Sequence, residues 1–306
     1  MPLAPAACIL GVSGPRLTPD EVALFRRRPP AGAILFARNV QDPAQLLALT
    51  AELRDLLGEA APILIDQEGG RVARLRPPHW PSFPPAAQFE GGPEAAARAN
   101  ARAIGDICRA MGLDVVCAPC LDLRVEGAHA IIGDRGFSAD PAEIARLGSA
   151  WAEGLREADC TPVMKHIPGH GRALLDSHEA LPRVTATEED LAPFRALAGR
   201  NLWAMTAHIL YPEWDAARPA TISPSIIARI IRGEIGHDGV LISDDLAMKA
   251  LCGRPDDLAR AVLEAGCDLA LHCPGVFEEN AAILDSCPPL AAAALERLAS
   301  TGHGWG

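Results

Sequence analysis

The chain has 306 residues, of which 49% are hydrophobic, and it carries a formal net charge of −11 at pH 7. Its apolar stretches are all shorter than the roughly 18 residues that a membrane-spanning helix needs, and the acidic balance argues against a nucleic-acid-binding surface. We therefore expect a cytoplasmic protein of one large domain or two ordinary ones, without a membrane or nucleic-acid partner.

The chain contains nine cysteines, most of them in apolar surroundings. This pattern is typical of free, buried thiols in a reducing compartment. Cys117 and Cys120 form a C-x-x-C pair, but the sequence nearby shows neither a helix N-terminus nor a second pair of ligands. We therefore expect no redox or zinc role for this pair.

Short apolar runs recur along the chain, and polar or glycine-rich residues follow each of them. We expect these runs to be buried strands, at Ala7–Val12, Ala31–Ala37, Pro62–Ile65, Leu113–Ala118, Thr161–Met164, Leu202–Thr206, Val240–Ile242 and Asp268–Leu271. Helical patterns lie between them, at Pro43–Leu57, Pro93–Met111, Ala142–Ala158, Thr187–Ala198, Ser223–Glu234 and Pro255–Ala265. Because Pro193 fits only the first turn of a helix, we expect the regular helix around it to begin after Asp190.

Strands that alternate with helices predict an α/β protein with a (β/α)8 TIM barrel. Continuously apolar strands suit a parallel sheet that is covered on both faces. A doubly wound open sheet is the main alternative, but Gly11-Val12-Ser13-Gly14 is a weak match to the phosphate-binding fingerprint that often follows its first strand. No linker or repeat is apparent, so we expect a single domain over residues 1–306.

Polar side chains follow most of the predicted strands. In a (β/α)8 barrel the active site lies at the carboxyl ends of the strands, so many of these side chains are expected to meet at one mouth. The candidates are Asp66, Arg71, Arg74, Asp122, Lys165, His166, His208, Asp244 and His272.

The densest group of such residues is Lys165–His178, which follows the fifth predicted strand and holds three His and one Asp. Histidine changes charge near neutral pH and a carboxylate can orient it, so this segment is a candidate for proton transfer. The connection Gly169–Ala186 is long enough to be a mobile active-site loop. The same residue types can also bind a metal, and the ligands would then be His166, His170, Asp176 and His178.

Asp244 and Asp245 follow the seventh predicted strand. A carboxylate there can attack an electrophilic carbon, as the hydrolysis of a glycoside requires. Only one of two successive strand residues can point into the barrel mouth. A structural role for the pair is equally possible, because two acidic residues before Leu246-Ala247-Met248 can also cap a helix.

Four motifs carry a resemblance to a known family, and they occur in that family's order. They are Asp66-Gln67-Glu68-Gly69-Gly70-Arg71-Val72, Ile132-Gly133-Asp134-Arg135, Lys165-His166-Ile167-Pro168-Gly169-His170-Gly171 followed by Asp176-Ser177-His178, and Ser243-Asp244-Asp245-Leu246-Ala247-Met248. These motifs resemble the signatures D-Q-E-G-G-R-V, I-G-x-R, K-H-[FI]-P-G-H-G with D-S-H, and S-D-D-L-x-M of bacterial β-N-acetylhexosaminidases of glycoside hydrolase family 3. The resemblance extends over nearly the whole chain.

The resemblance implies an exo-acting, retaining hydrolase that releases terminal β-linked N-acetylglucosamine from muropeptides during recycling of the cell wall. It implies no metal or other cofactor. By position, Asp244 matches the nucleophile and His178 the acid/base, with Asp176 as the partner of His178. The positions that match sugar-binding residues of the family are Asp66, Arg74, Arg135, Lys165 and His166.

The chain departs from the family's usual pattern at one position, and three alternative functions stay open. Gly136 stands where the family usually has Ser, so a looser backbone is expected there. A strand-end lysine can also form a Schiff base with a carbonyl substrate, which would make Lys165 the key residue of a lyase. The remaining alternatives are a β-glucosidase-like family 3 hydrolase of different sugar specificity and a sugar-binding relative without catalysis.

Overall fold

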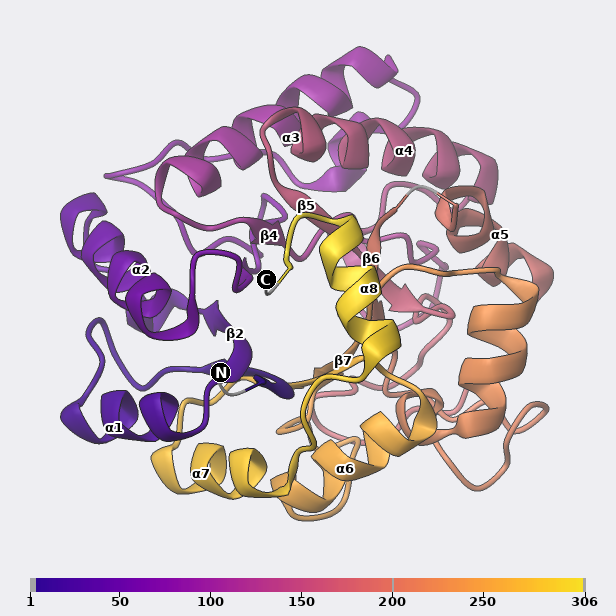
Figure 1. The fold of residues 1–306 in the computed structure, drawn as a ribbon. Helices are drawn as coiled ribbons and strands as arrows, with labels where there is room; N and C mark the ends of the chain where they lie inside the picture. Colours follow the sequence, from indigo (N-terminus) through magenta and orange to yellow (C-terminus); the bar gives the residue numbers. More distant parts are fainter. Residues whose placement is uncertain (1–3, 200, 305–306) are drawn as a thin grey trace.

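The computed structural model describes residues 4–199 and 201–304. Within them, eight parallel strands close into a barrel in chain order, from β1 to β8, with helices around the outside (Figure 1). The predicted (β/α)8 barrel is therefore confirmed, and the open sheet is excluded. Of the domain expected over residues 1–306, residues 1–3, 200 and 305–306 lie outside the described part. None of the described helices is long and apolar enough to cross a membrane.

Each predicted apolar run overlaps a strand. The strands are β1 Ala6–Gly11, β2 Pro30–Leu35, β3 Ile63–Ile65, β4 Val115–Val116, β5 Thr161–Ile167, β6 Trp203–Thr206, β7 Leu241–Asp245 and β8 Leu269–His272. β4 is shorter than predicted because the amide of Ala118 turns back onto the carbonyl of Val116, at 2.8 Å, and bends the chain. β5 and β7 are longer than predicted, because polar residues of the barrel mouth continue both strands.

The helices also follow the predicted pattern, with additions at both ends of the chain. They are α1 Pro19–Arg27, α2 Pro43–Leu57, α3 Glu94–Ala110, α4 Pro141–Glu157, α5 Glu188–Leu197, α6 Pro255–Ala265, α7 Phe277–Ser286 and α8 Ala292–Ser300. The segment Ile226–Glu234 (η5), predicted as a helix, winds with the wider π-type hydrogen bonding. Short 3-10 turns lie at Ala37–Asn39, Ala86–Phe89, Gly133–Arg135 and Ala220–Ile222.

Helix capping explains two of the departures from the predicted helices. In α5, Thr187 and Asp190 form a capping box, which stabilises the first turn from Glu188 onward. The expectation that this helix begins after Asp190 is therefore wrong, and Pro193 lies inside the helix. The unpredicted α1 also begins at a capping box, formed by Thr18 and Glu21.

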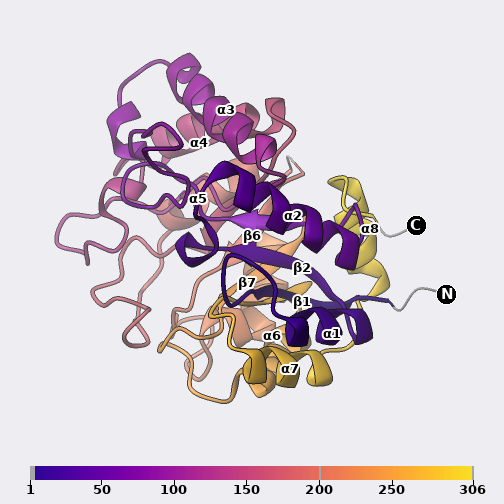
Figure 2. The same ribbon diagram turned by 90° about the vertical axis from the view of Figure 1, so that its left-hand side faces the viewer.

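Two apolar cores hold the barrel together. One fills the space between the strands and the outer helices, where α3 and α4 pack closely together. The other fills the barrel interior, with Ile9, Val163 and Trp203 among its members, and Ala294 and Leu298 of α8 pack against it. Figure 2 shows α8 at one end of the barrel and the long connections that follow the strands at the opposite end. One mouth is therefore closed by a helix, and the other is left for the site.

Candidate active site

A cavity of about 290 Å³ lies at the carboxyl ends of the strands. It is lined by seven of the eight residues that the family resemblance assigns to catalysis or sugar binding, and the eighth, Asp176, contacts His178 of the lining at 2.8 Å. The lining consists of Ile34, Phe36, Asp66, Glu68, Arg71, Val72, Arg74, Ile131, Arg135, Lys165, His166, His178, Met205, Asp244, Asp245, Met248, Leu271 and Cys273.

Successive residues enter the cavity from two strands. Lys165 and His166 both line it from β5, and Asp244 and Asp245 both line it from β7. The register of β5 against β6 shifts between Lys165 and Ile167, and that of β7 against β8 shifts between Ile242 and Asp245. Such irregularities break the alternation of a regular strand. The expectation that only one residue of the Asp pair faces the mouth is therefore wrong.

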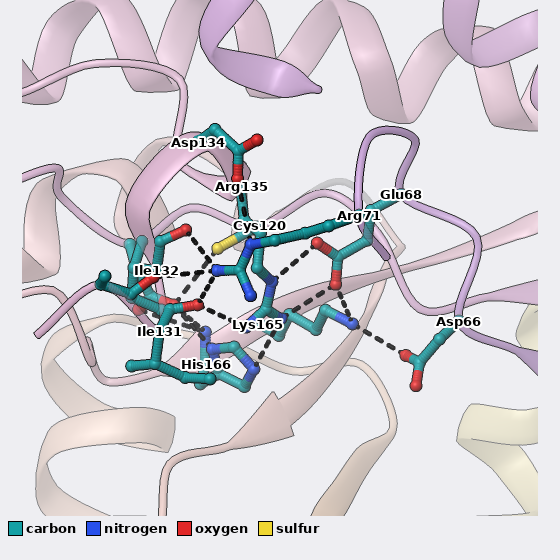
Figure 3. A network of polar contacts seen from close by, with 12 residues as sticks. Asp66, Glu68, Arg71, Cys120, Ile131, Ile132, Asp134, Arg135, Lys165 and His166 are labelled. Carbon is teal, nitrogen blue, oxygen red and sulfur yellow. Dashed lines mark hydrogen bonds and ion pairs between the residues drawn. The ribbon is translucent and has the colours of Figure 1, made fainter. Parts of the chain in front are cut away.

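A buried network of charges forms one wall of the cavity (Figure 3). The ammonium group of Lys165 lies 2.9 Å from Asp66 and 2.6 Å from Glu68. Glu68 also accepts two hydrogen bonds from the guanidinium of Arg135, both at 2.9 Å. Arg74 donates to the second oxygen of Asp66 at 3.1 Å. Each of these charges has an opposite neighbour, so their side chains are held in fixed positions around the cavity.

The network keeps its groups ionised. Burial acts to raise the pKa of Asp66 and Glu68, but Lys165 and the arginines outweigh it, so the pKa of Asp66 is lowered and that of Glu68 falls to about 2. Burial acts to lower the pKa of Lys165, but Asp66 and Glu68 raise it above its usual value. A Schiff-base reaction needs a neutral amine. The ion pairs of Lys165 therefore argue against the lyase alternative.

Glu68 belongs to this network, yet the sequence analysis did not select it. Its carboxylate joins Lys165 to Arg135, and its side chain is only 7% exposed. The signal was present, since Glu68 stands two residues after Asp66 in the same motif. Three cations, Arg74, Arg135 and Lys165, surround Asp66, and Glu68 supplies the second carboxylate that pairs with them.

Replacing Glu68 with glutamine is expected to lower the free energy of unfolding by about 3 kcal/mol, because Arg135 and Lys165 lose a buried counter-charge. The folded-state pKa of Glu68 lies below its usual value of 4.5. Its contribution is therefore present above pH 4.5 and is lost as the pH falls towards 2, so the difference between wild type and variant should shrink over that range.

Urea unfolding at several pH values measures this difference. Asp134→Asn is the matched control, because its partner Arg71 and Asp134 itself are each about half exposed. That exposed pair should contribute less than about 1 kcal/mol. A Glu68→Gln variant as stable as the control at pH 7 would contradict the structural importance of the network.

His166 is oriented by a carboxylate that lies behind the cavity. Its Nδ1 donates to Asp122 at 2.6 Å, and its Nε2 lies 3.4 Å from Arg135. Asp122 also accepts a hydrogen bond from the backbone N–H of His170 at 2.6 Å. Burial acts to raise the pKa of Asp122, but the two histidines lower it. Asp122 therefore fixes the orientation of the His166 ring, which lines the cavity beside Lys165.

Cys120, Asp122 and His166 place three possible metal-ligand atoms within 4.8 Å of one another. These groups already bond to each other, because Asp122 accepts from His166 and, at 3.3 Å, from the thiol of Cys120. Burial and the neighbouring Asp122 raise the pKa of Cys120 well above its usual value, so the thiol stays protonated. A hydrogen-bonded group explains the arrangement without an ion. The nine cysteines, all within the described residues, are free, and only Cys252 is exposed.

Asp244 and Asp245 have different surroundings. Asp245 accepts hydrogen bonds from the backbone N–H groups of Ala247 and Cys273, at 3.1 and 3.0 Å, and so holds the turn after β7 against β8. Asp244 accepts a hydrogen bond from the N–H of Asp245 at 2.8 Å. The capping role weighed for the pair therefore falls to Asp245, and Asp244 keeps a carboxylate oxygen for a ligand.

The environment of Asp244 favours its ionised form. Burial acts to raise its pKa, but the rings of His166 and His208 and the N–H of Asp245 bring the pKa below its usual value. His208 does not line the cavity and lies behind it, with hydrogen bonds to Thr221 at 2.7 Å and to the carbonyl of Asp245 at 3.0 Å. The carboxylate of Asp244 is thus negatively charged at neutral pH.

The other candidate catalytic group enters the cavity from the loop after β5. The Nδ1 atom of His178 lies 2.8 Å from the carboxylate of Asp176. Because a carboxylate only accepts hydrogen bonds, Nδ1 carries the hydrogen and Nε2 is left to exchange a proton with a ligand. Burial acts to raise the pKa of Asp176, but the backbone and ring N–H groups of His178 lower it.

Arg71 and Arg74 line the cavity near Phe36, and Arg38 lies behind this lining. Arg38 and Arg74 lie over the ring of Phe36, with their guanidinium carbons 5.1 and 5.2 Å from its centroid. Arg71 donates hydrogen bonds to the carbonyls of Ala130 and Ile131 and so ties the connection after β4 to the mouth. Figure 3 shows Arg71 beside Ile131. This connection continues to Arg135, whose position is thereby fixed.

The backbone after Arg135 is tightly packed. A Cβ atom at Gly136 would lie 2.8 Å from the carbonyl oxygen of Asp122. The expectation of a looser backbone at Gly136 is therefore wrong, because the absent side chain allows a close approach of two segments.

The cavity can bind a small polar molecule and act on it from two directions. Fixed ionic and hydrogen-bonding groups suit a ring that carries several hydroxyls, while an ionised carboxylate and an Asp–His pair suit attack at carbon and proton transfer to oxygen. Such a constellation at the mouth of a (β/α)8 barrel defines a hydrolase of glycosides.

Comparison with known proteins agrees with this class. Residues 16–299 match the family described as glycosyl hydrolase family 3 N terminal domain. The chain therefore belongs to glycoside hydrolase family 3, as its motifs indicated, and it is a glycosidase. A β-hexosaminidase of Alkalilimnicola ehrlichii is 41% identical over 280 residues, which cover 87% of this chain and 80% of the relative.

Solved structures show the same barrel. NagZ from Neisseria gonorrhoeae, in complex with N-trifluoroacetyl-D-glucosamine, has a TM-score of 0.87 and 33% identity over 99% of this chain and 92% of its own. A family 3 β-N-acetylglucosaminidase from Paenibacillus sp. str. FPU-7 has a TM-score of 0.85 and 33% identity. The match covers 97% of this chain and 60% of that one.

Proposed function

We propose that this protein is an exo-acting, retaining β-N-acetylhexosaminidase that releases terminal β-linked N-acetylglucosamine. The observation that carries the proposal is the meeting of Asp244 and His178 in one cavity beside the Lys165 network. The relatives support the sugar specificity, because they are β-hexosaminidases and one was solved with a glucosamine derivative. A cavity of about 290 Å³ is at the small end of ligand sites, which suits one terminal sugar.

The proposed reaction has two displacements, and Asp244 is the nucleophile. In the first, an oxygen of Asp244 bonds to the anomeric carbon while the bond from that carbon to the leaving oxygen breaks. The proton on Nε2 of His178 moves to the leaving oxygen. In the second, neutral His178 takes a proton from water, the water oxygen bonds to the anomeric carbon, and Asp244 is released. Two inversions at one carbon give net retention.

The remaining residues hold the sugar. Asp66 follows β3, and Lys165 and His166 lie in β5, so two strands of the barrel present hydrogen-bonding groups to one ring. Arg74 and Arg135 close the two sides of the network. Asp176 is proposed to orient the ring of His178 before the first displacement, since its carboxylate accepts the hydrogen bond from Nδ1 and leaves Nε2 for the leaving oxygen. The same carboxylate keeps the ring correctly turned when it accepts a proton from water.

We further propose that the substrates are muropeptide fragments, processed in the cytoplasm by a single barrel domain. The bacterial relatives support a cell-wall fragment as the source of N-acetylglucosamine. Free, mostly buried cysteines are in keeping with a reducing compartment. A β-glucosidase-like specificity is the competing assignment for the same catalytic groups.

A panel of chromogenic β-glycosides tests the specificity. We expect the N-acetylglucosaminide to have the highest kcat/KM, and the glucoside, which lacks the acetamido group, to be at least tenfold slower. The N-acetylgalactosaminide, which differs at one hydroxyl, tests how strictly the network selects the sugar. A preference for the glucoside would instead establish the competing assignment. Product analysis on a purified muropeptide then separates exo-cleavage from internal cleavage.

A further inference from the structure

Ser177 is a buried residue within an exposed part of the loop after β5. Leu174 and Leu175 are 70% and 52% exposed, and the side chain of His178 is 59% exposed, whereas Ser177 is only 2% exposed. A segment with so little buried apolar surface depends on a few polar contacts for its position. Ser177 stands between the two members of the Asp176–His178 pair, so any contact it makes acts on both.

Two contacts hold Ser177. Its hydroxyl lies 2.9 Å from Nε2 of His170, and both groups are buried. Its carbonyl oxygen accepts a hydrogen bond from the N–H of Ala250 at 3.1 Å, which ties the loop to the segment after β7. The middle of the loop is therefore attached both to its own first turn and to the neighbouring connection.

His170 is itself held rigidly by the site. Its backbone N–H donates to Asp122 at 2.6 Å, and the other oxygen of that carboxylate accepts from the ring of His166, also at 2.6 Å. The rings of His166 and His170 meet edge to face, with centroids 5.6 Å apart. Tyr211 donates to the carbonyl of Gly169 at 2.5 Å and holds the turn before His170. His170 therefore connects the loop, through Asp122, to His166, one of the residues proposed to bind the sugar.

The bond between His170 and Ser177 persists through the neutral pH range. Burial, together with the neighbouring His166, lowers the pKa of His170 to about 4. The ring therefore stays uncharged well below pH 7 and can accept from, or donate to, the Ser177 hydroxyl. The other ring nitrogen, Nδ1, has no hydrogen-bond partner among the described residues, so Ser177 provides the polar contact of this side chain.

We propose that His170 and Ser177 are positioning residues for proton transfer, which hold the Asp176–His178 pair at the cavity through their hydrogen bond. This inference rests on the proposed role of His178 as acid/base. Proton transfer requires the donor within hydrogen-bond distance of the leaving oxygen, and a small displacement of the donor lowers the rate steeply. Without the Ser177 hydroxyl, Asp176 and His178 still bond to each other, but the pair is held at the cavity less firmly.

Ser177→Ala tests this role on aryl β-N-acetylglucosaminides that differ in their leaving group. We expect kcat/KM to fall roughly tenfold or more for a poor leaving group, which needs the proton, and by less than about threefold for a good one. Leu175→Ala is the matched control, because Leu175 lies in the same loop and is exposed. An equal loss on both substrates, or no loss on either, would overturn the inference.

A double-mutant cycle shows whether Ser177 acts through His178. In a His178→Ala background the Ser177→Ala change should have no further effect on the poor leaving group, because the donor that it positions is gone. Full additivity of the two losses would contradict the positioning role. Thermal melting of each variant establishes that the chain is folded before its rates are compared.

Hydrogen exchange tests, independently of catalysis, whether the hydrogen bond between Ser177 and His170 holds the loop. Backbone amides from residue 176 to 180 should exchange several-fold faster in Ser177→Ala than in wild type, whereas amides of β5 should not change. Unchanged exchange in the loop would overturn the anchor itself. If wild type hydrolyses none of the panel, the proposed function fails, and the exchange result still decides whether Ser177 holds the loop.

Discussion

Asp244→Ala is expected to lower kcat/KM for a chromogenic β-N-acetylglucosaminide by about three orders of magnitude or more. Without this carboxylate the proposed nucleophile is gone, because the carboxylate of Asp245 is held by the backbone N–H groups of Ala247 and Cys273. A thousandfold loss equals about 4 kcal/mol of transition-state stabilisation. The effect should be large because the site keeps Asp244 ionised, with a pKa below its usual value despite burial. Initial rates on the good leaving group measure it directly.

The identity of the nucleophile has an independent test. A fluorinated glycoside that slows the second displacement should label the wild-type protein, and mass spectrometry should locate the sugar on Asp244. Azide added to Asp244→Ala should restore turnover and give the α-azide, because a single displacement inverts the anomeric carbon. Asp238→Ala is the control, since Asp238 precedes the same strand and its side chain is 96% exposed. A label on Asp245 would show that the two carboxylates have been assigned the wrong way round.

The barrel could be predicted because it depends on features that repeat. Each parallel strand is buried on both faces and is therefore apolar throughout, and each helix has one apolar face. α2 and α6 begin and end where their helical patterns predicted. α1 was missed although Thr18, Pro19 and Glu21 form its capping signal, because a nine-residue helix adds little periodicity.

The mouth of the barrel was harder to predict because it departs from regular geometry. Alternation along a strand allowed only one of Asp244 and Asp245 to face the site, whereas the register shift in β7 brings both to it. A register shift depends on the fit of neighbouring strands. No local residue pattern predicts such a shift, so only the structure reveals how β7 pairs with β8.

The supporting roles of residues that hold other site residues were harder to predict than the site itself. Glu68 and Asp122 make contacts with residues 67 and 44 positions away, Arg135 and His166. Ser177 has a polar, small side chain in a stretch that resembles a surface loop, and nothing in its neighbours predicts its burial. The residues proposed to meet the substrate were found through motifs, while those that hold them depend on tertiary contacts.

Tertiary contacts also determine which part of the segment Lys165–His178 is exposed. The proline and glycines of the turn Pro168–Gly171 suggest a hinge, yet His170 and Gly171 are buried and packed against Asp122 and Leu123. The exposed residues near the pair are Leu174, Leu175, His178, Glu179 and Ala180. Any movement of the acid/base pair must therefore break the Ser177 contacts, and it leaves the turn in place.

His178→Ala should separate substrates by the quality of their leaving group. For a poor leaving group, whose oxygen must be protonated as the bond breaks, we expect kcat/KM to fall by roughly 10² to 10⁴. For a leaving group that departs as a stable anion, the first displacement needs no proton, so its rate should change far less. Rates of the first displacement on both substrates, measured before the steady state, give this ratio.

The matched control for that experiment is His129→Ala. His129 is exposed and close enough to lower the pKa of Asp176, but the hydrogen bond to that carboxylate comes from His178. Loss of His129 should therefore leave the ratio between the two substrates unchanged. Asp176→Asn should shift the ratio in the same direction as His178→Ala, by less, because the imidazole remains while its hydrogen-bond partner loses its charge. An equal fall on both substrates in His178→Ala would make His178 a structural residue of the loop, and the proton donor would then have to be sought among the other groups that line the cavity.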